Sequence, residues 1–471
     1  MTLMSHSHFN AKSKKVPLVK TQHRLIKTTI PAPNTEKILK EIQKCEVRSM
    51  HGQLPIIWDK AENFNVYDIA GNKFIDFTST IFLANSGHAN PHIIKALRKV
   101  LRQKLLHTYT FVSKVRTTFL KKLIGVTPHF CEKAFLLSSG TEATECALKL
   151  IRLWGEKQNP KKLGVISFVG NMHGRTLGAE MLKGKPETST WIGYRDPNMY
   201  HLPFPYPWLP NANKKKYDWA RHFEHDMTTL KKHGLDFKNL CGFIIESYQG
   251  WGAVFYPKTY LKALEKFAKK HGALIAFDEI QSGFGRTGKL FCYEHYNVKP
   301  DLLCLGKGLS GSLPLSAVIG YKKIMDLPDV GSMSSTHSAN PMCCAAGLAN
   351  IEALINQKLI NKSKTLGEFF HKKLLVIKQR YPGVISDVQG KGLLAAVIFT
   401  KGAERQPLSK LCDLICEKAM QKGLLLVHTG RESIKLAPPL TISKSALKEG
   451  LATFEESIAE TIKENPKLTK L

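Results

Sequence analysis

The chain has 471 residues, of which 43% are hydrophobic and 23% charged, a composition typical of a globular protein. No apolar run approaches the ~20 residues that cross a bilayer, so we expect no membrane partner. Lys and Arg number 69 against 38 Asp and Glu, but they are spread along the chain without a long basic block. We therefore interpret the net charge of +31 as a solvated surface that attracts small anions, and we expect no nucleic-acid partner.

The ten cysteines lie mostly in apolar contexts, as Cys146 and Cys304 do. The neighbouring Cys343 and Cys344 have no CxxC partner and no histidines at zinc spacing. We therefore expect reduced thiols, no metal site and a cytoplasmic location.

The order of apolar and polar stretches predicts three segments behind a basic, flexible tail at residues 1–20. Residues 21–94 form an N-terminal segment, in which "GNKFIDFTSTIFLANSGHANPHIIKAL" indicates a strand, a loop and the start of a helix. In residues 95–345, apolar runs such as "LGVISFV", "CGFIIESY" and "ALIAFDEI" alternate with amphipathic helices. This pattern predicts a large α/β domain with a mostly parallel sheet flanked by helices. The pattern of helices and a few strands in residues 346–471 predicts a smaller α+β domain that packs with the N-terminal segment.

The first chemical signal in chain order is "SSGTEA", which joins a strand to a helix. Ser139 and Glu142 fit a capping box, and Gly140 leaves backbone N–H groups facing outward. Such a helix N-terminus binds phosphate through its free N–H groups and its dipole. Most capped helices bind nothing, so the motif alone leaves both interpretations open.

The glycines of "GFGRTGKL" fit both a dinucleotide fingerprint and the start of a P-loop. Leu290 stands where a P-loop has the Ser or Thr that holds magnesium. The glycines do not follow their strand directly and no clean helix follows them, as a dinucleotide site requires. We therefore reject both nucleotide interpretations.

Two ionisable residues end neighbouring apolar runs. Asp278 closes "ALIAFD", where it could hold a protonated ring nitrogen of a ligand or simply cap a helix. Lys307 follows "DLLCLG", and we expect Gly306 and Gly308 to leave room for a ligand. A lysine amine in a dry pocket can form a Schiff base, although a solvated lysine at a strand end is the alternative. A phosphate cradle, an acid and this lysine, in that order, predict pyridoxal 5'-phosphate as the cofactor.

With these motifs, the chain resembles the class III aminotransferases of pyridoxal-phosphate fold type I. These include the ornithine, acetylornithine, 4-aminobutyrate and other ω-amino transaminases. The resemblance runs from about residue 24 to about residue 443. Its strongest block is "LIAFDEIQSGFGRTGKLF" followed by "PDLLCLGKGLSGSLPLSAVIG". Further matches are "SSGTEATECALKLIR", "MHGRTLGA", "SSTHSANPMCCAA" and "LAPPLTIS".

By this resemblance, Lys307 forms the Schiff base and moves the proton, and Asp278 pairs with the pyridine nitrogen. Met172 stands where the family stacks an aromatic ring on the cofactor. His173 could support a cofactor-binding residue from behind or be only structural, and we favour the structural role. Thr336 would come from a partner subunit, which implies a homodimer with active sites at the subunit interface. The cofactor-binding residues that the resemblance implies are Lys307, Asp278, Gln281, Gly140, Thr141, Met172, Thr336 and Glu246.

The chain departs from the family at the substrate gate. The ornithine and 4-aminobutyrate members have a gate glutamate in "EPVQGEGG", whereas "ESYQGWGA" has Trp251, which should narrow the pocket and make it more apolar. Lys435 replaces the arginine that pairs with that glutamate, and lysine cannot form the bidentate fork to a carboxylate. Lys435 or Arg431 could still bind a substrate carboxylate, or both could be plain surface charges. Tyr109 and Ile81 fall in segments that line the substrate entrance in the family.

We therefore predict an aminotransferase that moves an amino group from a primary amine or (ω-)amino acid to a 2-oxo acid in a two-step ping-pong reaction. A decarboxylase, an aminomutase or a racemase of the same fold is the alternative. All of these reactions begin from the same covalent adduct of the substrate amine and the cofactor. The sequence leaves the identity of donor and acceptor open.

Overall fold

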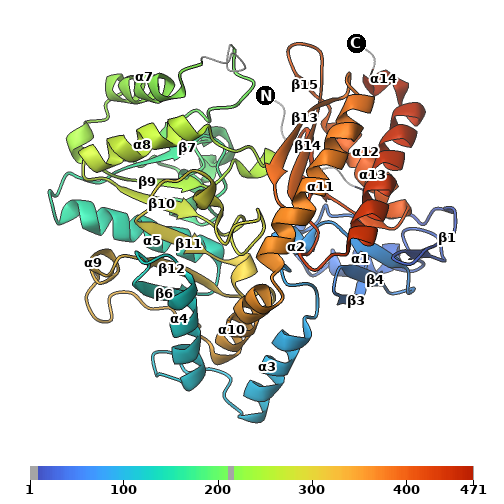
Figure 1. The fold of residues 1–471 in the computed structure, drawn as a ribbon, viewed down its shortest axis with the longest axis horizontal. Helices are drawn as coiled ribbons and strands as arrows, with labels where there is room; N and C mark the ends of the chain where they lie inside the picture. Colours follow the sequence, from blue (N-terminus) through green and yellow to red (C-terminus); the bar gives the residue numbers. More distant parts are fainter. Residues whose placement is uncertain (1–8, 211–216, 470–471) are drawn as a thin grey trace.

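The computed structural model describes residues 9–210 and 217–469. The middle of the chain forms a sheet with helices on both sides, on the left of Figure 1. The N-terminal and C-terminal segments lie together on the right, where they form two further sheets.

Seven strands of the described residues form the central sheet: β6 (Lys133–Leu137), β7 (Gly164–Phe168), β8 (Met199–Leu202), β9 (Leu240–Glu246), β10 (Leu274–Asp278), β11 (Leu302–Leu305) and β12 (Ser316–Gly320). Their order across the sheet is β6-β12-β11-β10-β9-β7-β8. Parallel pairing joins β11, β10, β9, β7 and β8, whereas β12 is antiparallel to both of its neighbours. The predicted α/β class with a mostly parallel sheet is confirmed.

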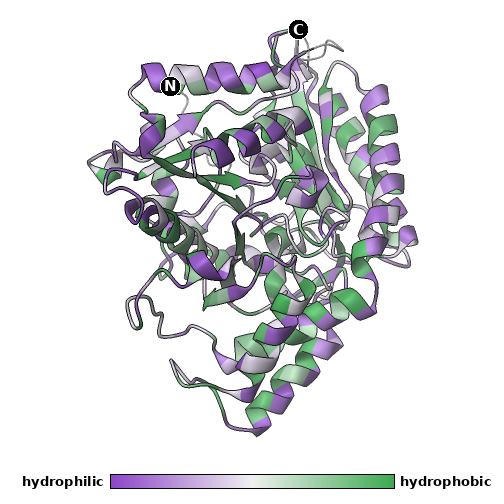
Figure 2. Ribbon diagram, turned by 60° about the vertical axis from the view of Figure 1, so that its left-hand side comes forward, coloured by the Kyte–Doolittle hydropathy of each residue, from purple (hydrophilic) through white to green (hydrophobic). Residues whose placement is uncertain are grey.

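Helices cover both faces of this sheet, so alternate residues of each strand enter different cores. On β9, Phe243 belongs to the core that includes residues of α7 (Trp219–Lys232) and α8 (Lys258–Lys270). Its neighbour Ile244 belongs to the core formed with α5 (Gly140–Glu156). The strands are therefore apolar along most of their length, while the surface helices alternate between hydrophobic and hydrophilic residues (Figure 2).

The other helices lie around the central sheet and in the right-hand part. They are α1 (Thr35–Ile42), α2 (Ser79–Phe82), α3 (Pro91–Arg102), α4 (Lys114–Val126), α6 (Leu177–Met181), α9 (Lys322–Met325), α10 (Pro341–Asn356), α11 (Leu359–Arg380), α12 (Ser409–Gln421), α13 (Lys444–Glu464) and α14 (Pro466–Thr469). In the part of the chain that the structure describes, none of the helices combines the length and the apolar character needed to cross a bilayer.

Two smaller sheets join the ends of the chain. The first contains β1 (Val19–Lys20), β2 (Leu25–Ile26), β3 (Trp58–Glu62), β4 (Asn65–Asp68), β5 (Lys73–Asp76) and β16 (Leu424–Leu425). The second contains β13 (Ile385–Lys391), β14 (Leu394–Lys401), β15 (Gln406–Pro407), β17 (Val427–His428) and β18 (Ser433–Leu436). Because β16 pairs in parallel with β5, the C-terminal segment completes the N-terminal sheet, as the fold class predicted. The bounds 21–94, 95–345 and 346–471 stay a prediction.

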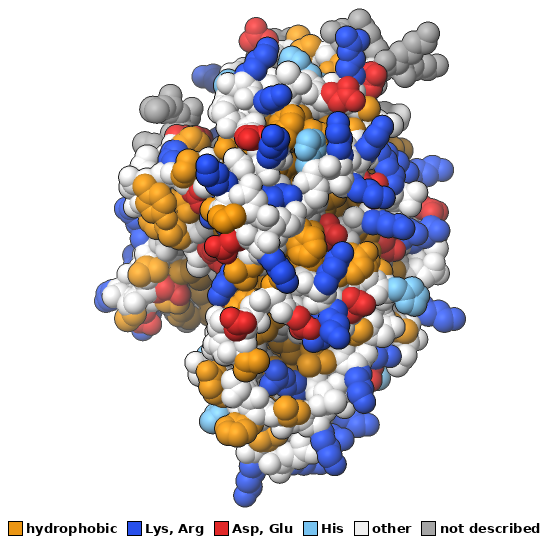
Figure 3. Space-filling view, turned by 90° about the vertical axis from the view of Figure 1, so that its left-hand side faces the viewer, with side chains coloured by type: hydrophobic (Ala, Val, Ile, Leu, Met, Phe, Trp, Pro, Cys, Tyr) orange, Lys and Arg blue, Asp and Glu red, His pale blue; other side chains and the backbone are white. Residues whose placement is uncertain are grey.

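The predicted tail, residues 1–20, is only partly within the described chain, because residues 1–8 lie outside it. Lys14 and Ile30 exchange two backbone hydrogen bonds of 3.0 and 3.2 Å, and β1 pairs with β2. These bonds fix residues 14–20 to the N-terminal segment, so this part of the chain is not the free tail that its charge suggested. The basic side chains on the face shown in Figure 3 are scattered rather than gathered into one patch.

A single buried arginine connects the three segments of the chain. Arg286 has no exposed surface, and it comes from the "GFGRTGKL" stretch, which forms turns rather than a nucleotide-binding strand–helix junction. Its Nη1 donates to the carbonyl oxygens of Leu393 and Pro438 in the C-terminal segment. Its Nη2 donates to the side chains of Asn85 and Ser79 in the N-terminal segment. All four acceptors would lose their donor together if the guanidinium were removed.

We predict that Arg286→Met lowers the free energy of unfolding by about 3 kcal/mol or more, because it leaves buried acceptors unpaired. Urea denaturation followed by circular dichroism measures the change. Arg380→Ala is the control, since it removes an exposed ion pair with Glu455 and should leave the midpoint unchanged. Equal stability of Arg286→Met and the wild type would show that Arg286 does not hold the segments together.

Candidate active site

The register of the central sheet brings two acids and a lysine to one edge. Asp278, the last residue of β10, stands opposite Glu246 on β9 and opposite Cys304 on β11. Lys307 follows Cys304 by three residues, so it also lies at the carboxyl end of the strands. This edge is where open α/β sheets bind their ligands.

The backbone at Lys307 is strained. Its φ is +41°, in the left-handed region that a residue with a side chain rarely adopts, and such strain is typical of functional sites. Burial lowers the pKa of the Lys307 amine, and the charges of Asp278 and Glu246 oppose that shift only in part. Lys307 therefore loses its proton to give the nucleophilic amine more readily than a solvated lysine does.

The glycines beside Lys307 make room for protein atoms rather than for a ligand. A Cβ on Gly308 would stand 2.5 Å from Asn85 Nδ2, and one on Gly306 would stand 3.2 Å from the Ile280 side chain. Our expectation that both glycines make space for a ligand is wrong on this point. Gly308 instead lets the N-terminal segment, through Asn85, pack against the lysine loop.

Asp278 is buried and hydrogen-bonded at both oxygens. Its Oδ2 lies 2.8 Å from Nδ1 of His173, and its Oδ1 accepts the backbone N–H of Ile280. The other ring nitrogen of His173 lies 3.2 Å from Ser167 Oγ and 3.3 Å from Asn171 Nδ2. We interpreted His173 as structural, but it contacts the central acid directly. Sequence reasoning could have found it only through its place beside Met172 in the "MHGRT" motif.

The N-terminus of α5 faces Lys307 across a cavity of about 340 Å³. The predicted capping box is present, because Ser139 Oγ accepts the N–H of Glu142 and the Glu142 carboxylate accepts the N–H of Ser139. The cavity wall includes Gly140 and Thr141, whose backbone N–H groups have no partner within the helix. This end of the cavity therefore suits an anion.

A smaller cavity of about 30 Å³ is also lined by Lys307. Its lining includes Glu246, Gln281 and Asp278, and Met172 lines both cavities. The carboxylate of Glu246 accepts the N–H groups of Met172 and Gly250, yet burial raises its pKa to about 7. The structure thus gathers every predicted cofactor residue except Thr336 around Lys307.

Lys435 is the second buried amine beside this site, with 6% of its surface exposed. Its Nζ donates to the carbonyl oxygen of Gly250 at 3.1 Å and lies 3.5 Å from Gln281 Oε1. The ring of Phe82 lies 4.7 Å from the ammonium. Burial, and then the charge of Lys307, lower the pKa of Lys435 to about 7. Lys435 is therefore not the surface charge that the sequence left open.

The other substrate residues lie farther out. Trp251 lines neither of the two cavities; instead its Nε1 donates to the hydroxyl of Tyr206, and Arg431 stacks on its ring. The expected narrowing of the pocket by Trp251 is thus not seen in the walls of these cavities. Tyr109 and Thr336 are exposed in segments that meet where Tyr109 OH lies 3.5 Å from Ser334 Oγ.

Ile81 lies in α2, where four consecutive residues from Ser79 to Phe82 have positive φ. A left-handed turn of side-chain-bearing residues is costly and persists only where its surroundings fix it. Ser79 Oγ donates to Ala437 O at 2.5 Å and accepts from Arg286, which fixes the start of the turn. The turn places Phe82 over Lys435 and brings the next residue, Leu83, into the wall of the larger cavity. Ile81 itself is 41% exposed.

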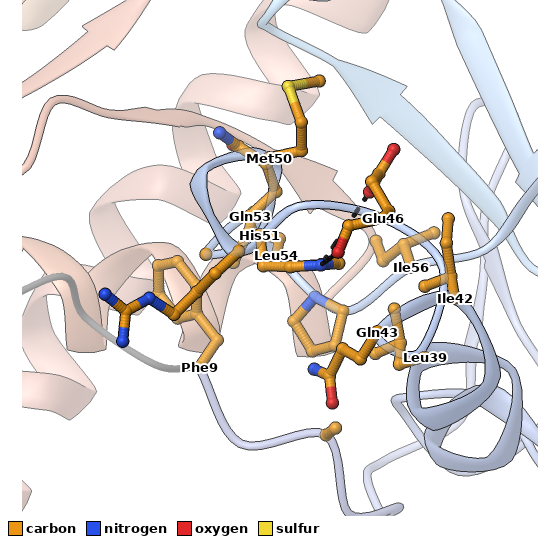
Figure 4. A pocket seen from close by; sticks show the side chains of 14 residues that line it. Phe9, Leu39, Ile42, Gln43, Glu46, Met50, His51, Gln53, Leu54 and Ile56 are labelled. Atoms are coloured by element: carbon orange, nitrogen blue, oxygen red, sulfur yellow. Dashed lines mark hydrogen bonds and ion pairs between the residues drawn. The ribbon is translucent and has the colours of Figure 1, made fainter.

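A further cavity of about 560 Å³ lies in the N-terminal segment (Figure 4). Its wall contains Glu46, Arg48 and His51 among apolar residues of α1 and the following loop, and His51 contacts Glu46. None of these lining residues is a buried lysine or caps the N-terminus of a helix. We therefore place the candidate active site at the edge of the central sheet. Within residues 9–210 and 217–469, no group of three or more His, Cys, Asp or Glu side chains could hold a metal ion.

Comparisons with known proteins agree with this geometry. The family model "Aminotransferase class-III" matches residues 47–458. The ornithine aminotransferase of Saccharomyces cerevisiae is 35% identical over 86% of this chain and 93% of its own length. The alanine/serine racemase of Pyrococcus horikoshii is 31% identical over 92% of both chains. The structure of ornithine aminotransferase from Toxoplasma gondii, described with partial occupancy of PLP at its active site, superposes with a TM-score of 0.79 and 26% identity over 92% of this chain and 96% of that one.

We predict that His173→Phe destabilises the protein by about 1.5–3 kcal/mol, because Asp278 then loses a buried charge-assisted partner. Denaturation of the cofactor-free protein measures the loss. Ser167→Ala removes only the outer bond to His173 and should cost about 1 kcal/mol or less. In a double-mutant cycle, Asp278→Asn should add little to His173→Phe; fully additive effects would mean that the two side chains do not interact.

Proposed function

Because the chain belongs to the class III aminotransferases, a pyridoxal-phosphate-dependent family, we propose that the cavities around Lys307 form its active site. The protein is an aminotransferase, and its substrates are an amino donor and a 2-oxo acid acceptor. The observation that carries the site assignment is the convergence of Lys307, Asp278 and the α5 N-terminus on one cavity edge.

The residues present fit pyridoxal phosphate at each of its polar groups. The unpaired N–H groups at Gly140 and Thr141 suit the phosphate. The hydrogen-bonded carboxylate of Asp278 suits the protonated ring nitrogen, and the Lys307 amine suits the aldehyde. Met172 lies between the two cavities, where its thioether can pack on the face of the ring. Gln281 and Glu246 complete the proposed cofactor-binding set.

When bound, pyridoxal phosphate supplies the electron sink that lets a bond to the amine-bearing carbon break. Lys307 Nζ would hold the aldehyde carbon of the cofactor, and burial makes its proton easier to lose than that of a solvated lysine. The same Nζ would accept and return the proton of the amine-bearing carbon of the substrate. Asp278 would hold a proton at the ring nitrogen, and His173 orients the Asp278 carboxylate through a 2.8 Å contact.

We propose that the enzyme is a homodimer and that the partner subunit's Thr336 completes the phosphate site. Thr336 is exposed and lines neither cavity of its own subunit among the described residues. Nearby, Phe111 and Val112 are 78% and 77% exposed, which supports a partner surface over them. All ten cysteines are free, which supports a cytoplasmic location for the enzyme.

On the substrate side, we propose that Lys435 binds the carboxylate of an amino acid or oxo acid. It is buried without an ion-pair partner in the described chain, and an unpaired buried amine is satisfied by an anionic ligand. Ile81 and Tyr109 are proposed as residues of the entrance. We propose that Trp251 and Arg431 also contact the substrate, at a greater distance from Lys307 than Lys435.

We predict that mixing the holoenzyme with a suitable amine, without any oxo acid, converts the bound cofactor to its amine form. Absorbance spectroscopy with a panel of amines and amino acids measures this half-reaction. In Lys307→Ala the conversion should slow by about 10²–10⁴-fold, because the base is missing. Substrate loss as carbon dioxide or as an isomer, with no change in the cofactor, would instead support the decarboxylase, mutase or racemase alternatives.

Lys435→Ala is the matched control for this experiment, because Lys435 is the other buried amine at the site. Reduction with borohydride should fix the cofactor covalently to the wild type and to Lys435→Ala, but not to Lys307→Ala. Mass spectrometry of the intact protein detects the added mass. Labelling of Lys307→Ala at wild-type levels would contradict the assignment of Lys307.

We predict that binding of pentanoate, an unreactive monocarboxylate, weakens as the pH rises above about 7. The pKa of Lys435 in the free site is about 7, so its amine is charged below that pH and loses its charge above it. Affinity should therefore be constant below pH 7 and fall by up to about tenfold per pH unit above it.

The control variants for this prediction separate Lys435 from Glu246 and Lys307, which also face it. Lys435→Arg should bind with no fall above pH 7, because arginine stays charged. Lys435→Met should bind weakly at every pH. Calorimetry from pH 6 to 9 measures all three proteins, and an unchanged fall in Lys435→Met would assign the titration to another group.

A further inference from the structure

The strap, residues 172–176, lies against the first turns of α5. The hydroxyl oxygen of Thr144 on α5 lies 2.6 Å from the carbonyl oxygen of His173 in the strap. Gly174 has a φ of +142°, and a Cβ there would stand 2.1 Å from Thr141 Oγ1 and 2.6 Å from Thr141 Cβ. Position 174 therefore requires glycine, which lets the strap approach the start of α5 closely.

One carboxylate of α5 holds the end of this strap. Glu145 Oε1 accepts the hydroxyl of Thr176 at 2.6 Å. The same oxygen accepts the N–H groups of Gly178 and Ala179 at 2.8 and 3.1 Å. These N–H groups lie in the first turn of α6, where Thr176 stands at the N-cap but makes no side-chain cap of its own. Glu145 therefore caps α6 from another helix and supplies the negative charge that a helix N-terminus favours.

The same contacts fix the direction of a short chain of hydroxyl groups. Thr176 Oγ1 lies 2.6 Å from Thr141 Oγ1, and the distance alone allows either hydroxyl to donate. A carboxylate can only accept, so Thr176 uses its single hydroxyl proton on Glu145. Thr141 must then donate to Thr176. This bond holds the Thr141 side chain toward the strap, and the free backbone N–H groups of α5 are left for an anion in the cavity.

The strap connects the two ends of the proposed cofactor site. Gly174 lines the larger cavity together with Thr141 at the N-terminus of α5. Met172 lines both cavities, and Nδ1 of His173 lies 2.8 Å from Oδ2 of Asp278. A shift of the strap would therefore change the spacing between the anion-binding helix end and the central acid.

We propose that Glu145 is a positioning residue for the phosphate of the cofactor. It lines neither of the two cavities, so it acts through Thr176 and Thr141, which it holds together at the phosphate end of the site. This inference rests on the proposed function, because it assumes that the phosphate of pyridoxal phosphate lies at the N-terminus of α5. Without Glu145, the strap and the first turn of α5 can move apart, and the phosphate loses a preorganised set of N–H groups.

The test compares pyridoxal phosphate with pyridoxal, which has a hydroxyl in place of the phosphate, on the full-length protein. Absorbance titration of the cofactor-free protein gives a Kd for each compound, and the ratio of the pyridoxal Kd to the pyridoxal phosphate Kd measures what the phosphate contributes. In Glu145→Ala this ratio should fall by about tenfold or more, because hydrogen bonds to a charged group are lost behind the phosphate site. The Kd of pyridoxal itself should change by about twofold or less.

Glu145→Gln is the conservative variant that should restore the ratio. All three donors reach the same oxygen, Oε1, so the amide oxygen of a glutamine can accept them in the same place. The ratio should return to within about threefold of the wild type. Thr176→Val removes the hydroxyl between Glu145 and Thr141 but leaves the cap of α6, so it should give an intermediate fall. If Glu145→Ala does not fold, a wild-type ratio in Thr176→Val would overturn the proposal.

Glu132→Ala is the matched control, because Glu132 also caps a short helix from another segment. Its Oε2 accepts the N–H of Lys322, the first residue of α9, at 2.7 Å, and neither residue lines the two cavities. Its loss should lower the melting temperature and leave the ratio unchanged. A wild-type ratio in Glu145→Ala, a Glu145→Gln as impaired as Glu145→Ala, or an equal fall in Glu132→Ala would each overturn the proposal.

The measurement is independent of turnover, so the two proposals can fail separately. If borohydride fixes the cofactor to Lys307 but the ratio does not depend on Glu145, then the positioning role is wrong and the proposed active site stands. If borohydride fixes no cofactor to Lys307, but calorimetry shows that the wild type binds inorganic phosphate more tightly than Glu145→Ala does, then the assignment of Lys307 is wrong and the role of Glu145 stands. The melting temperature of each variant shows that it is folded.

Discussion

The pairing register at the carboxyl ends of β9, β10 and β11 is the constraint on which the proposed active site depends. It places Asp278 between Glu246 and Cys304, and so brings Lys307 to the same edge. A slip of one residue would turn the Asp278 side chain to the other face of the sheet. Apolar residues fill both faces below this edge, so burial fixes the register and the register fixes the site.

The same burial sets the charges of the groups that the register brings together. It favours the neutral form of Lys307, Lys435 and Glu246, since each loses water that would solvate its charge. Asp278, also buried, has a hydrogen-bond partner at each of its two oxygens, His173 at one and a backbone N–H at the other. In the proposed active site, one dry edge thus provides an amine that loses its proton more readily and a fully hydrogen-bonded acid.

Features that depend on consecutive residues could be predicted from the sequence. The capping box at Ser139, the acid that ends a strand and the lysine after an apolar run are all of this kind, and the structure contains each of them. Contacts between distant segments could not be predicted. His173 meets Asp278 across 105 positions of the chain, and the need for glycine after Lys307 arises from the packing of Asn85. No local sequence pattern identifies such distant partners, because only the folded chain brings them into contact.

The departures from the family at the gate become consistent with each other once the contacts are known. An arginine at position 435 would be buried and permanently charged, and no described carboxylate lies at ion-pair distance from Lys435 to balance it. Lysine avoids that cost, because its amine can lose its proton beside Phe82 and Lys307. Trp251, in place of the glutamate, offers a ring face instead of a charge, and Arg431 occupies that face from farther along the chain. The permanent positive charge of Arg431 is thus partly exposed, where water and Glu432 solvate it, whereas the buried amine of Lys435 can lose its proton.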